Sequence, residues 1–432
     1  QDFFARNNMA VGLHFDKESW GVDRTIAGSL GIWGVYGFAD SKMTADDIIA
    51  ALPLSDPAKA ELKRIYEIDE DKIPDVPVYA KKDYLAKISY RDFMTKHLGV
   101  TEPDIFTLFQ DVTADTGLGI DSLDAYIALT EVDLPGFAAA GLQKSSGEQE
   151  PYIHHFPDGN ASIARLLVRS LIPDCAPGSS MDDVVLARFD YGKLDQDTSH
   201  VRLRLNSTAV RVEHQGAPDN ADLLHTTYVK DGKAYRATSR HCVLACNNTI
   251  IPALCPTLPE TQAEDLMDQV KQPILYTNVV LRNWQAWKDL GIGRVYSPTS
   301  YYLSTNIDFP VSMGGYAFPG GPDEPIIIRM TKYPHASNQG LSAKDQYRVA
   351  RHELLATPFE TMERHARQQL TSILGRAGFD PAEDILGITV NRWAHGYAYS
   401  VGYHSLFETD YDDINDPRYP HVKSRNPLGR IT

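Results

Sequence analysis

One stretch carries most of the information about the fold: Phe156-Pro157-Asp158-Gly159-Asn160-Ala161-Ser162, which runs directly into the apolar segment 163–171. Pro–Asp–Gly predicts a turn, and Asn160 or Ser162 is a suitable N-cap for the helix that the apolar spacing predicts. Free backbone N–H groups at such a helix start attract an anion or an electron-rich ring. The stretch therefore predicts a helix start, either as an ordinary capped helix or as part of a binding site.

The composition is that of an ordinary globular chain, long enough for two or three domains. The 432 residues are 43% hydrophobic and carry a net charge of −15, which disfavours nucleic acid and favours a cationic small molecule as partner. No run of about eighteen apolar residues occurs, so no transmembrane segment is predicted. The four cysteines have neither CxxC nor CxxCH spacing, so neither a zinc ribbon nor a covalently attached haem is predicted.

Local patterns divide the first part of the chain in two. Residues 1–145 are predicted to be mostly helical, and residues 146–260 carry short alternating runs that predict a sheet. Asp231-Gly232 lies between two of these runs and predicts a hairpin turn. The runs expected as strands are 184–189, 201–205, 209–214, 226–228, 234–238 and 241–246.

The second part of the chain repeats the mixture of strands and helices. Residues 261–400 carry a strand-rich block and then a long helical pattern over 343–375, which Pro358 is expected to interrupt. Residues 401–432 end in what reads as the start of a strand, and the chain begins without a methionine, so we expect it to be the interior of a longer protein. The blocks together predict a mixed α/β (α+β) fold.

The order of these features resembles the flavin-containing amine oxidase family, and within it the spermidine dehydrogenase-like members. The closest phrases are 155–165 and 276–284, and the similarity extends over nearly the whole chain. It implies an incomplete dinucleotide-binding domain and a mixed-sheet substrate domain with a helical region. The implied parts are 1–145 on the substrate side, 146–260 in the FAD-binding domain, 261–400 in the substrate-binding domain, and 401–432 returning toward the FAD-binding domain.

The resemblance implies FAD as cofactor. In this family the glycine turn lies against the flavin, and glycine permits close backbone approach at Gly159. The strand 209–212 matches one whose backbone pairs with the adenine, which implies Val210, although an ordinary sheet strand explains this residue as well. The implied FAD contacts are Pro157, Asp158, Gly159, Asn160, Ala161, Val210, Trp393 and Gly396.

The implied catalytic residues lie in two segments. Segment 393–400 matches the one in which an aromatic pair frames the amine, so Tyr397 or Tyr399 would steer the reacting carbon, although such clusters also occur in ordinary cores. Many members have a lysine bonded through water to the flavin N5, and alignment places Asn278 there, with Lys271 seven residues earlier. We expect the lysine to be replaced, with Lys271 as the alternative.

Further residues are implied for the substrate and for a second cofactor. His155 would reach the flavin edge, and Asp308 is a candidate carboxylate for a substrate ammonium group. The spermidine dehydrogenase-like members also imply a non-covalent haem b, for which His395 and His404 are candidate axial ligands.

Two parts of the family pattern are missing from this sequence. The first is the strand, GxGxxG turn and helix that hold the ADP moiety, because Gly117-Leu118-Gly119 does not follow an apolar strand. The second is the C-terminal segment that closes over the flavin. We therefore expect this chain to bind FAD poorly unless the full protein contains these segments.

The expected activity is FAD-dependent oxidation of a spermidine-like polyamine. A hydride passes from the carbon beside a secondary amine to the flavin N5, and the imine hydrolyses to an aldehyde and a shorter amine. The resemblance also implies a periplasmic location, whereas the sequence does not indicate the electron acceptor. Two alternatives stay open: a flavin-dependent desaturase or porphyrinogen oxidase that acts on an apolar substrate, and a catalytically silent binding module.

Overall fold

The computed structural model describes residues 3–31, 38–143, 155–398, 413 and 415–432. The chain forms two compact units. The first comprises Gln1–Ile153, Lys271–Pro310 and Pro319–Asp410, and the second comprises His154–Val270, Val311–Phe318 and Tyr411–Thr432. Both units contain helices and strands, so the mixed α/β fold class expected from the sequence is confirmed.

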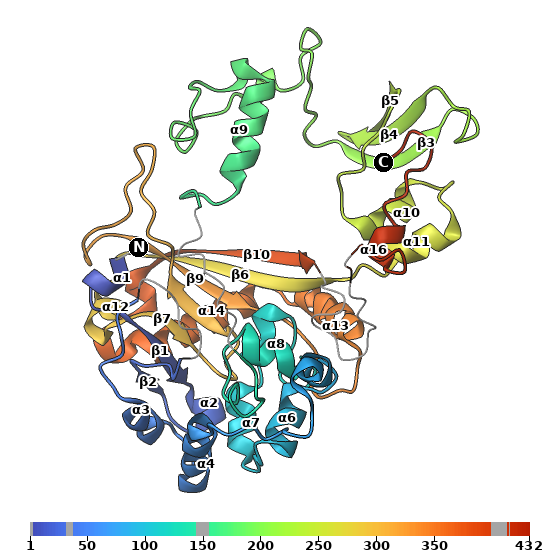
Figure 1. Ribbon diagram of the computed structural model, residues 1–432. Coiled ribbons are helices and arrows are strands. Elements are labelled where there is room, and N and C mark those ends of the chain that lie inside the picture. Colours follow the sequence, from blue (N-terminus) through green and yellow to red (C-terminus); the bar gives the residue numbers. More distant parts are fainter. Residues whose placement is uncertain (1–2, 32–37, 144–154, 399–412, 414) are drawn as a thin grey trace. The chain divides into compact units, whose positions relative to one another are not determined.

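The first unit is built on a seven-stranded sheet with the strand order β10-β6-β9-β8-β7-β1-β2 (Figure 1). Its strands are β1 (Ala10–Phe15), β2 (Arg24–Ile26), β6 (Lys271–Leu281), β7 (Ile292–Tyr296), β8 (Ser304–Ile307), β9 (Ile326–Lys332) and β10 (Ile385–Ala398). Neighbouring strands are antiparallel except β1 and β7, which are parallel. Every residue of β1 is buried, which explains why its sequence lacks the alternation of a half-exposed strand.

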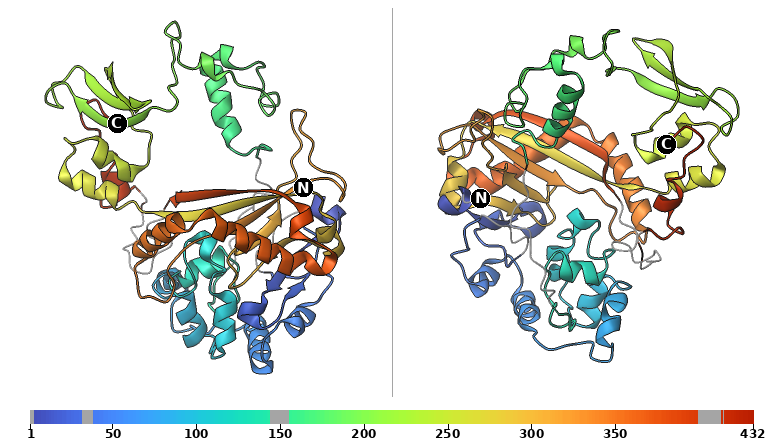
Figure 2. Two further views of the ribbon diagram at one scale, coloured as in Figure 1. Left: turned by 180° about the vertical axis from the view of Figure 1, so that it is seen from behind. Right: turned by 45° about the horizontal axis from the view of Figure 1, so that its top comes forward.

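Two long helices pack on one face of this sheet (Figure 2, left). They are α13 (Ala343–Ala356) and α14 (Phe359–Leu374), and Pro358 is the N-cap of the second, so the predicted interruption is confirmed. The Thr277 hydroxyl of β6 lies 2.8 Å from the Tyr302 hydroxyl, which donates to the Met362 carbonyl at 3.2 Å. Odd-numbered residues of β6 therefore point toward α14, and even-numbered residues point toward the opposite face.

Most other helices of the first unit form the region before residue 145, where helices were predicted (Figure 1). Ser55, Ser89 and Asp124 each accept a hydrogen bond from a backbone N–H in the first turn of a helix and so start α4, α6 and α8. The remaining helices of the unit are α1 (Phe3–Arg6), α2 (Lys17–Trp20), α3 (Ala45–Ala51), α4 (Asp56–Glu67), α5 (Lys81–Leu85), α6 (Tyr90–Lys96), α7 (Pro103–Phe109), α8 (Ala125–Thr130), α12 (Gln285–Leu290) and α15 (Pro381–Asp384).

The second unit contains a three-stranded antiparallel sheet and short helices. The sheet order is β3-β4-β5, and Asp231 and Gly232 join β4 to β5 with φ of 52° and 72°. Two consecutive positive φ values are typical of a tight hairpin turn, so the predicted hairpin is confirmed. The elements are α9 (Ala161–Leu171), β3 (Thr208–His214), β4 (Leu224–Lys230), β5 (Lys233–Ser239), α10 (Ile251–Leu254), α11 (Glu260–Met267) and α16 (Pro420–Lys423).

Three of the expected strands in this unit are not strands in the structure. Segments 184–189 and 201–205 make no sheet, and 241–246 makes one parallel bridge, between Cys242 and Ile431. A strand needs a partner strand for its backbone groups. Among the described residues, 241–246 has three backbone hydrogen bonds to 430–432, and the other two segments have no partner strand. Several of their apolar side chains are exposed, including Leu186 (58%), Leu205 (43%) and Val243 (73%), whereas Val184 is fully buried.

Candidate functional site

The glycine turn has the geometry that the sequence suggested. Gly159 has φ of +74°, in the left-handed region that favours glycine, and α9 begins two residues later at Ala161. A Cβ atom built on Gly159 would meet no heavy atom within 4 Å. The space beside this peptide is therefore open among the described residues, as the close approach of a planar ring requires.

The start of α9 is capped differently from the expectation. The Asn160 side chain makes no cap hydrogen bond. Instead the Asp158 carboxylate accepts a hydrogen bond from the Ser162 hydroxyl at 2.6 Å and forms an ion pair with Arg165 at 3.0 Å. A carboxylate at the helix start partly cancels the positive end of the helix dipole, so the turn suits a neutral ring better than an anion.

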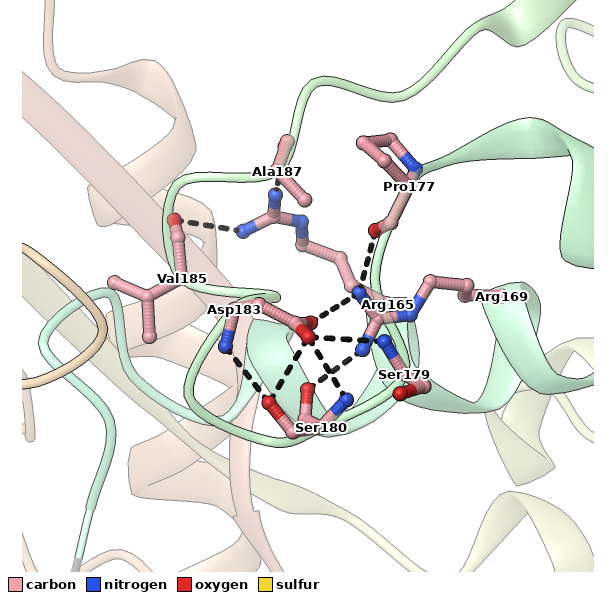
Figure 3. A network of polar contacts seen from close by, with 8 residues as sticks. All are labelled: Arg165, Arg169, Pro177, Ser179, Ser180, Asp183, Val185 and Ala187. Carbon is pink, nitrogen blue, oxygen red and sulfur yellow. Dashed lines mark hydrogen bonds and ion pairs between the residues drawn. The ribbon is translucent and has the colours of Figure 1, made fainter.

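Two arginines hold α9 against the loop that follows it (Figure 3). Arg165 donates to the Val185 and Ala187 carbonyls, and Arg169 donates to the Pro177 and Ser180 carbonyls and to Asp183 at 2.6 Å. Backbone N–H groups of Ser179 and Ser180 also bind Asp183, and together these hydrogen bonds strongly lower the pKa of its carboxyl. The loop is thus fastened to the same helix whose first turn follows Gly159.

Two further residues of the second unit were expected to contact the flavin cofactor: Val210 in strand β3, and His155 just before the glycine turn. Val210 is 45% exposed, and the register between β3 and β4 shifts between Ala209 and Arg211. Its backbone is therefore out of step with the ladder, as in a β-bulge, a feature often found near binding sites. His155 is half-buried, directly before the turn.

In the first unit, Tyr397 joins two tyrosines that the sequence analysis did not single out. The hydroxyls of Tyr276 and Tyr397 lie 3.3 Å apart, and the rings of Tyr333 and Tyr397 are 6.4 Å apart and nearly parallel. Burial raises the pKa of Tyr276, as does its contact with Tyr397, and burial also raises the pKa of Tyr333. These two phenols therefore stay protonated at neutral pH. We call Tyr276, Tyr333 and Tyr397 the tyrosine cluster.

A bulge in β10 places Tyr397 in this cluster. Trp393 pairs with Ile274 and Tyr397 with Gln272, so β10 has extra residues between these two pairs. A Cβ atom on Gly396 would lie 2.6 Å from the Ile274 side chain and 2.9 Å from the Gln272 carbonyl. Gly396, which was expected to contact the cofactor, is thus required for close packing of the bulge. Trp393 is 54% exposed beside it.

The cluster lies on the sheet face opposite α14. Strand register places residues from four adjacent strands in a row on this face: Asn278, Arg329, Asn306 and Arg294. A second row contains Tyr276, Thr331, Ser304 and Tyr296. Side chains that are directly opposite across antiparallel strands point to the same side, so we call these two rows, with the tyrosine cluster, the polar face. Asn306, Thr331, Ser304 and Tyr296 are buried, whereas the other four residues of the two rows are partly exposed. The polar face is thus unusually polar for the face of a central sheet.

The two candidates for the flavin-N5 position are clearly separated. Asn278 is in the polar face, whereas Lys271 pairs with Ala398 at the start of β6. Seven residues of strand span about 23 Å, and an odd spacing puts the two side chains on opposite faces. Lys271 therefore cannot occupy the position that Asn278 occupies.

Asp308, the candidate carboxylate for a substrate ammonium group, follows β8 and is half-buried. Its backbone N–H donates to the Ile327 carbonyl at 3.0 Å.

The described residues do not form a recognisable haem site. Arg351 lies 3.3 Å from His395 Nδ1, and because arginine can only donate, Nδ1 must accept and a neutral ring carries its proton on Nε2. The contact with Arg351 thus occupies Nδ1 of His395. Tyr399 and His404 lie outside the described residues. Among the residues that are described, no group of three or more His, Cys, Asp or Glu side chains could hold a metal ion.

Sequence reasoning missed Arg294, Arg329 and Tyr333. The available signal was Arg329 itself, a charged residue inside the apolar strand Ile326–Lys332, but its significance depends on strand pairing.

In the parts of the chain that the structure describes, no helix is long and apolar enough to cross a membrane.

Comparisons with known proteins give similarity to solved structures only. No family model matches the chain, and no curated protein matches it. A putrescine oxidase described as bound to putrescine matches with 14% identity over 90% of this chain and 71% of that chain, at a TM-score of 0.38. Cyclohexylamine oxidase from Brevibacterium oxydans matches with 12% identity, 98% and 74% coverage and a TM-score of 0.42. An oxidoreductase from Methanosarcina mazei matches with 10% identity, 82% and 65% coverage and a TM-score of 0.39.

Proposed function

We propose that this protein is a flavin-dependent enzyme that oxidises an amine. One observation carries the proposal: Tyr397, expected from the family resemblance to frame the amine, is joined by Tyr276 and Tyr333 in a tyrosine cluster on the polar face. Aromatic ring faces attract a cationic amine and exclude water from it. An aromatic surface that is partly exposed is suited to this task.

The residues near Gly159 fit the cofactor that this chemistry needs. The open space beside Gly159 admits a planar ring, and Pro157 to Ala161 with the backbone of Val210 would hold the FAD. When bound, FAD supplies the acceptor for a hydride from the carbon beside the amine nitrogen. We expect tight binding to require the strand–GxGxxG–helix segment that the sequence lacks.

The chain's own residues prepare the amine for oxidation. An amine must be neutral to release hydride, and the loss of water around a bound amine lowers its pKa by disfavouring the charged form. Tyr276 and Tyr333, whose pKa values are raised, stay neutral and add no negative charge that would oppose this shift. The Asn278 side chain can hold a water molecule by donating or accepting a hydrogen bond. Unlike a neutral lysine amine, its amide group cannot accept a proton from that water.

For the substrate, the sequence favours a spermidine-like polyamine. The net charge of −15 would attract a polycation, and Asp308 is the candidate partner for a terminal ammonium group. A periplasmic location and a haem as electron acceptor belong to the same hypothesis. The described residues do not identify a haem ligand, so no step is assigned to a haem.

The test is the visible spectrum of the purified full-length protein. A yellow flavin that is bleached anaerobically by an amine supports the proposal, and spermidine, putrescine and glycine would separate the amine classes. A flavin that no amine bleaches would instead favour an apolar substrate, and a colourless full-length protein would favour a binding module.

The variant Tyr397→Ala tests the role of the tyrosine cluster. We expect it to slow anaerobic bleaching at least tenfold while the flavin stays bound, because it removes the central ring of the cluster. Tyr235→Ala in β5, an exposed tyrosine of the second unit, is the matched control and should bleach at the normal rate. Equal rates in both variants would contradict the role given to the cluster.

A further inference from the structure

Arg329 of β9 is a cation without an anionic partner in the described part of the chain. Its guanidinium carbon lies 4.9 Å from the centre of the Phe309 ring and 5.7 Å from the centre of the Tyr276 ring. Its Nε atom is buried and makes no hydrogen bond. Two aromatic rings thus hold the guanidinium group in place, while a donor for an acceptor oxygen remains unused.

A second arginine increases the positive charge at this place. Arg294 of β7 lies in the same row of the polar face, separated from Arg329 by Asn306 of β8. Burial lowers the pKa of Arg294 to about 10, and the charge of Arg329 adds to this effect, which shows that the two cations are close. The nearby carboxylate of Asp115 has the opposite effect and raises the pKa of Arg294. The strand pairing thus brings two guanidinium groups into one row of the polar face.

The two arginines disfavour the binding of a ligand's ammonium group beside them. A partly buried cation without a counter-ion is unfavourable, and another cation beside it is repelled. A planar anion is the complementary ligand, because the guanidinium fork matches the two oxygens of a carboxylate. The other members of the row, Asn278 and Asn306, are neutral amides that can donate hydrogen bonds to the same group.

We infer that Arg329, held between Phe309 and Tyr276 and assisted by Arg294, binds a carboxylate group of the amine substrate. The inference rests on the proposed amine oxidation and narrows its substrate. Arg329 contacts the ring of Tyr276, whose hydroxyl reaches Tyr397, so the carboxylate and the amine would bind to neighbouring parts of the polar face. An amine that also carries a carboxylate fits this arrangement, which is a narrower substrate class than amines in general.

The test measures binding directly and uses no flavin. Benzoate and benzylamine have the same ring and opposite charges, and calorimetry on the 432-residue chain gives the affinity for each. We expect benzoate to bind, and Arg329→Met to weaken it about ten- to a hundredfold, the range for losing a charged hydrogen-bonded pair. Benzylamine should not bind more weakly to this variant.

Two further variants make the result specific. Arg392→Met is the matched control, because Arg392 is in the same sheet, pairs with Leu275 and therefore points to the opposite face. Arg329→Lys keeps the charge but loses the fork, and we expect an intermediate loss of benzoate affinity. Its thermal unfolding should match that of the unchanged chain, so it serves as the test if Arg329→Met does not fold.

Two results would overturn the inference: no benzoate binding by the unchanged chain, or equal benzoate affinity in the unchanged chain and the Arg329 variants. Loss of benzoate binding in Arg392→Met would also overturn it. Because these measurements need no cofactor, they are distinct from a failure of the proposed function, which would appear as a full-length flavoprotein that no amine bleaches.

Discussion

Because His14 is buried in its neutral form, we expect the free energy of unfolding to fall in mild acid. A single substitution of His14 should abolish this contribution. The residue is fully buried in β1, where its Nδ1 lies 3.0 Å from the Thr25 hydroxyl and its Nε2 lies 3.0 Å from the Ser372 hydroxyl. Burial lowers its pKa from 6.5 to about 4, and the nearby carboxylates of Asp23 and Asp16 only partly oppose this effect. The folded protein therefore keeps this imidazole neutral.

The sign of the effect follows from proton binding. Below pH 6.5 the unfolded chain takes up a proton at His14 that the folded chain does not, so stability falls with pH until the folded pKa near 4 is reached. For these two pKa values the loss is about 2 kcal/mol at pH 5 and about 3 kcal/mol at pH 4. His14→Gln keeps hydrogen-bonding groups but cannot titrate. The stability difference between the two proteins should therefore shrink by these amounts on acidification.

Urea unfolding followed by tryptophan fluorescence measures this difference. All five tryptophans belong to the first unit, so the signal reports the unfolding of the sheet that contains His14. Measurements at pH 8, 7, 6 and 5 cover the range in which only the unfolded chain is protonated. Carboxylates titrate equally in both proteins and cancel in the difference. Parallel curves of stability against pH for the two proteins would refute the reasoning.

Two glycine substitutions should separate packing from binding. Gly396→Ala places a methyl group within 3 Å of Ile274 and the Gln272 carbonyl, so it should destabilise the first unit by about 1–3 kcal/mol, visible as a lower urea midpoint. An unchanged midpoint would contradict the close packing of the bulge. Gly159→Ala meets no atom but strains a φ of +74°, so it should cost only about 1 kcal/mol while weakening FAD binding by the full-length protein. Normal flavin content would argue against a ring beside Gly159.

Elements with strong local patterns were predictable. Pro358 separates α13 from α14 because proline lacks an N–H and disrupts a continuing helix, and Asp231-Gly232 turns because these residues accept positive φ. The strands expected at 184–189, 201–205 and 241–246 show where local pattern is insufficient. Their residues suit a sheet, but a sheet also requires a partner strand, which no local pattern can supply.

For the candidate site, too, the sequence suggested individual residues, whereas their partners depend on the tertiary structure. The position of Tyr397 in a family-like segment made it a candidate, but its partner Tyr276 is 121 residues away in the sequence. Likewise, the sequence favoured Asn278 as the replacement for the lysine and kept Lys271 as the alternative, and only their strand positions show that the two side chains are far apart. Asn160 was a reasonable N-cap by residue type, yet Asp158 holds the helix start because Ser162 and Arg165 lie within reach.

The sequence by itself determined the mixed α/β class, the main helices, the hairpin and the glycine turn, because each depends on backbone preferences over a few residues. Only the tertiary structure decided that Arg294 and Arg329 face the same side as the tyrosine cluster. Strand pairing sets this arrangement: it brings residues from distant segments to neighbouring positions, and a shift of one residue in register would turn Arg329 toward the helices.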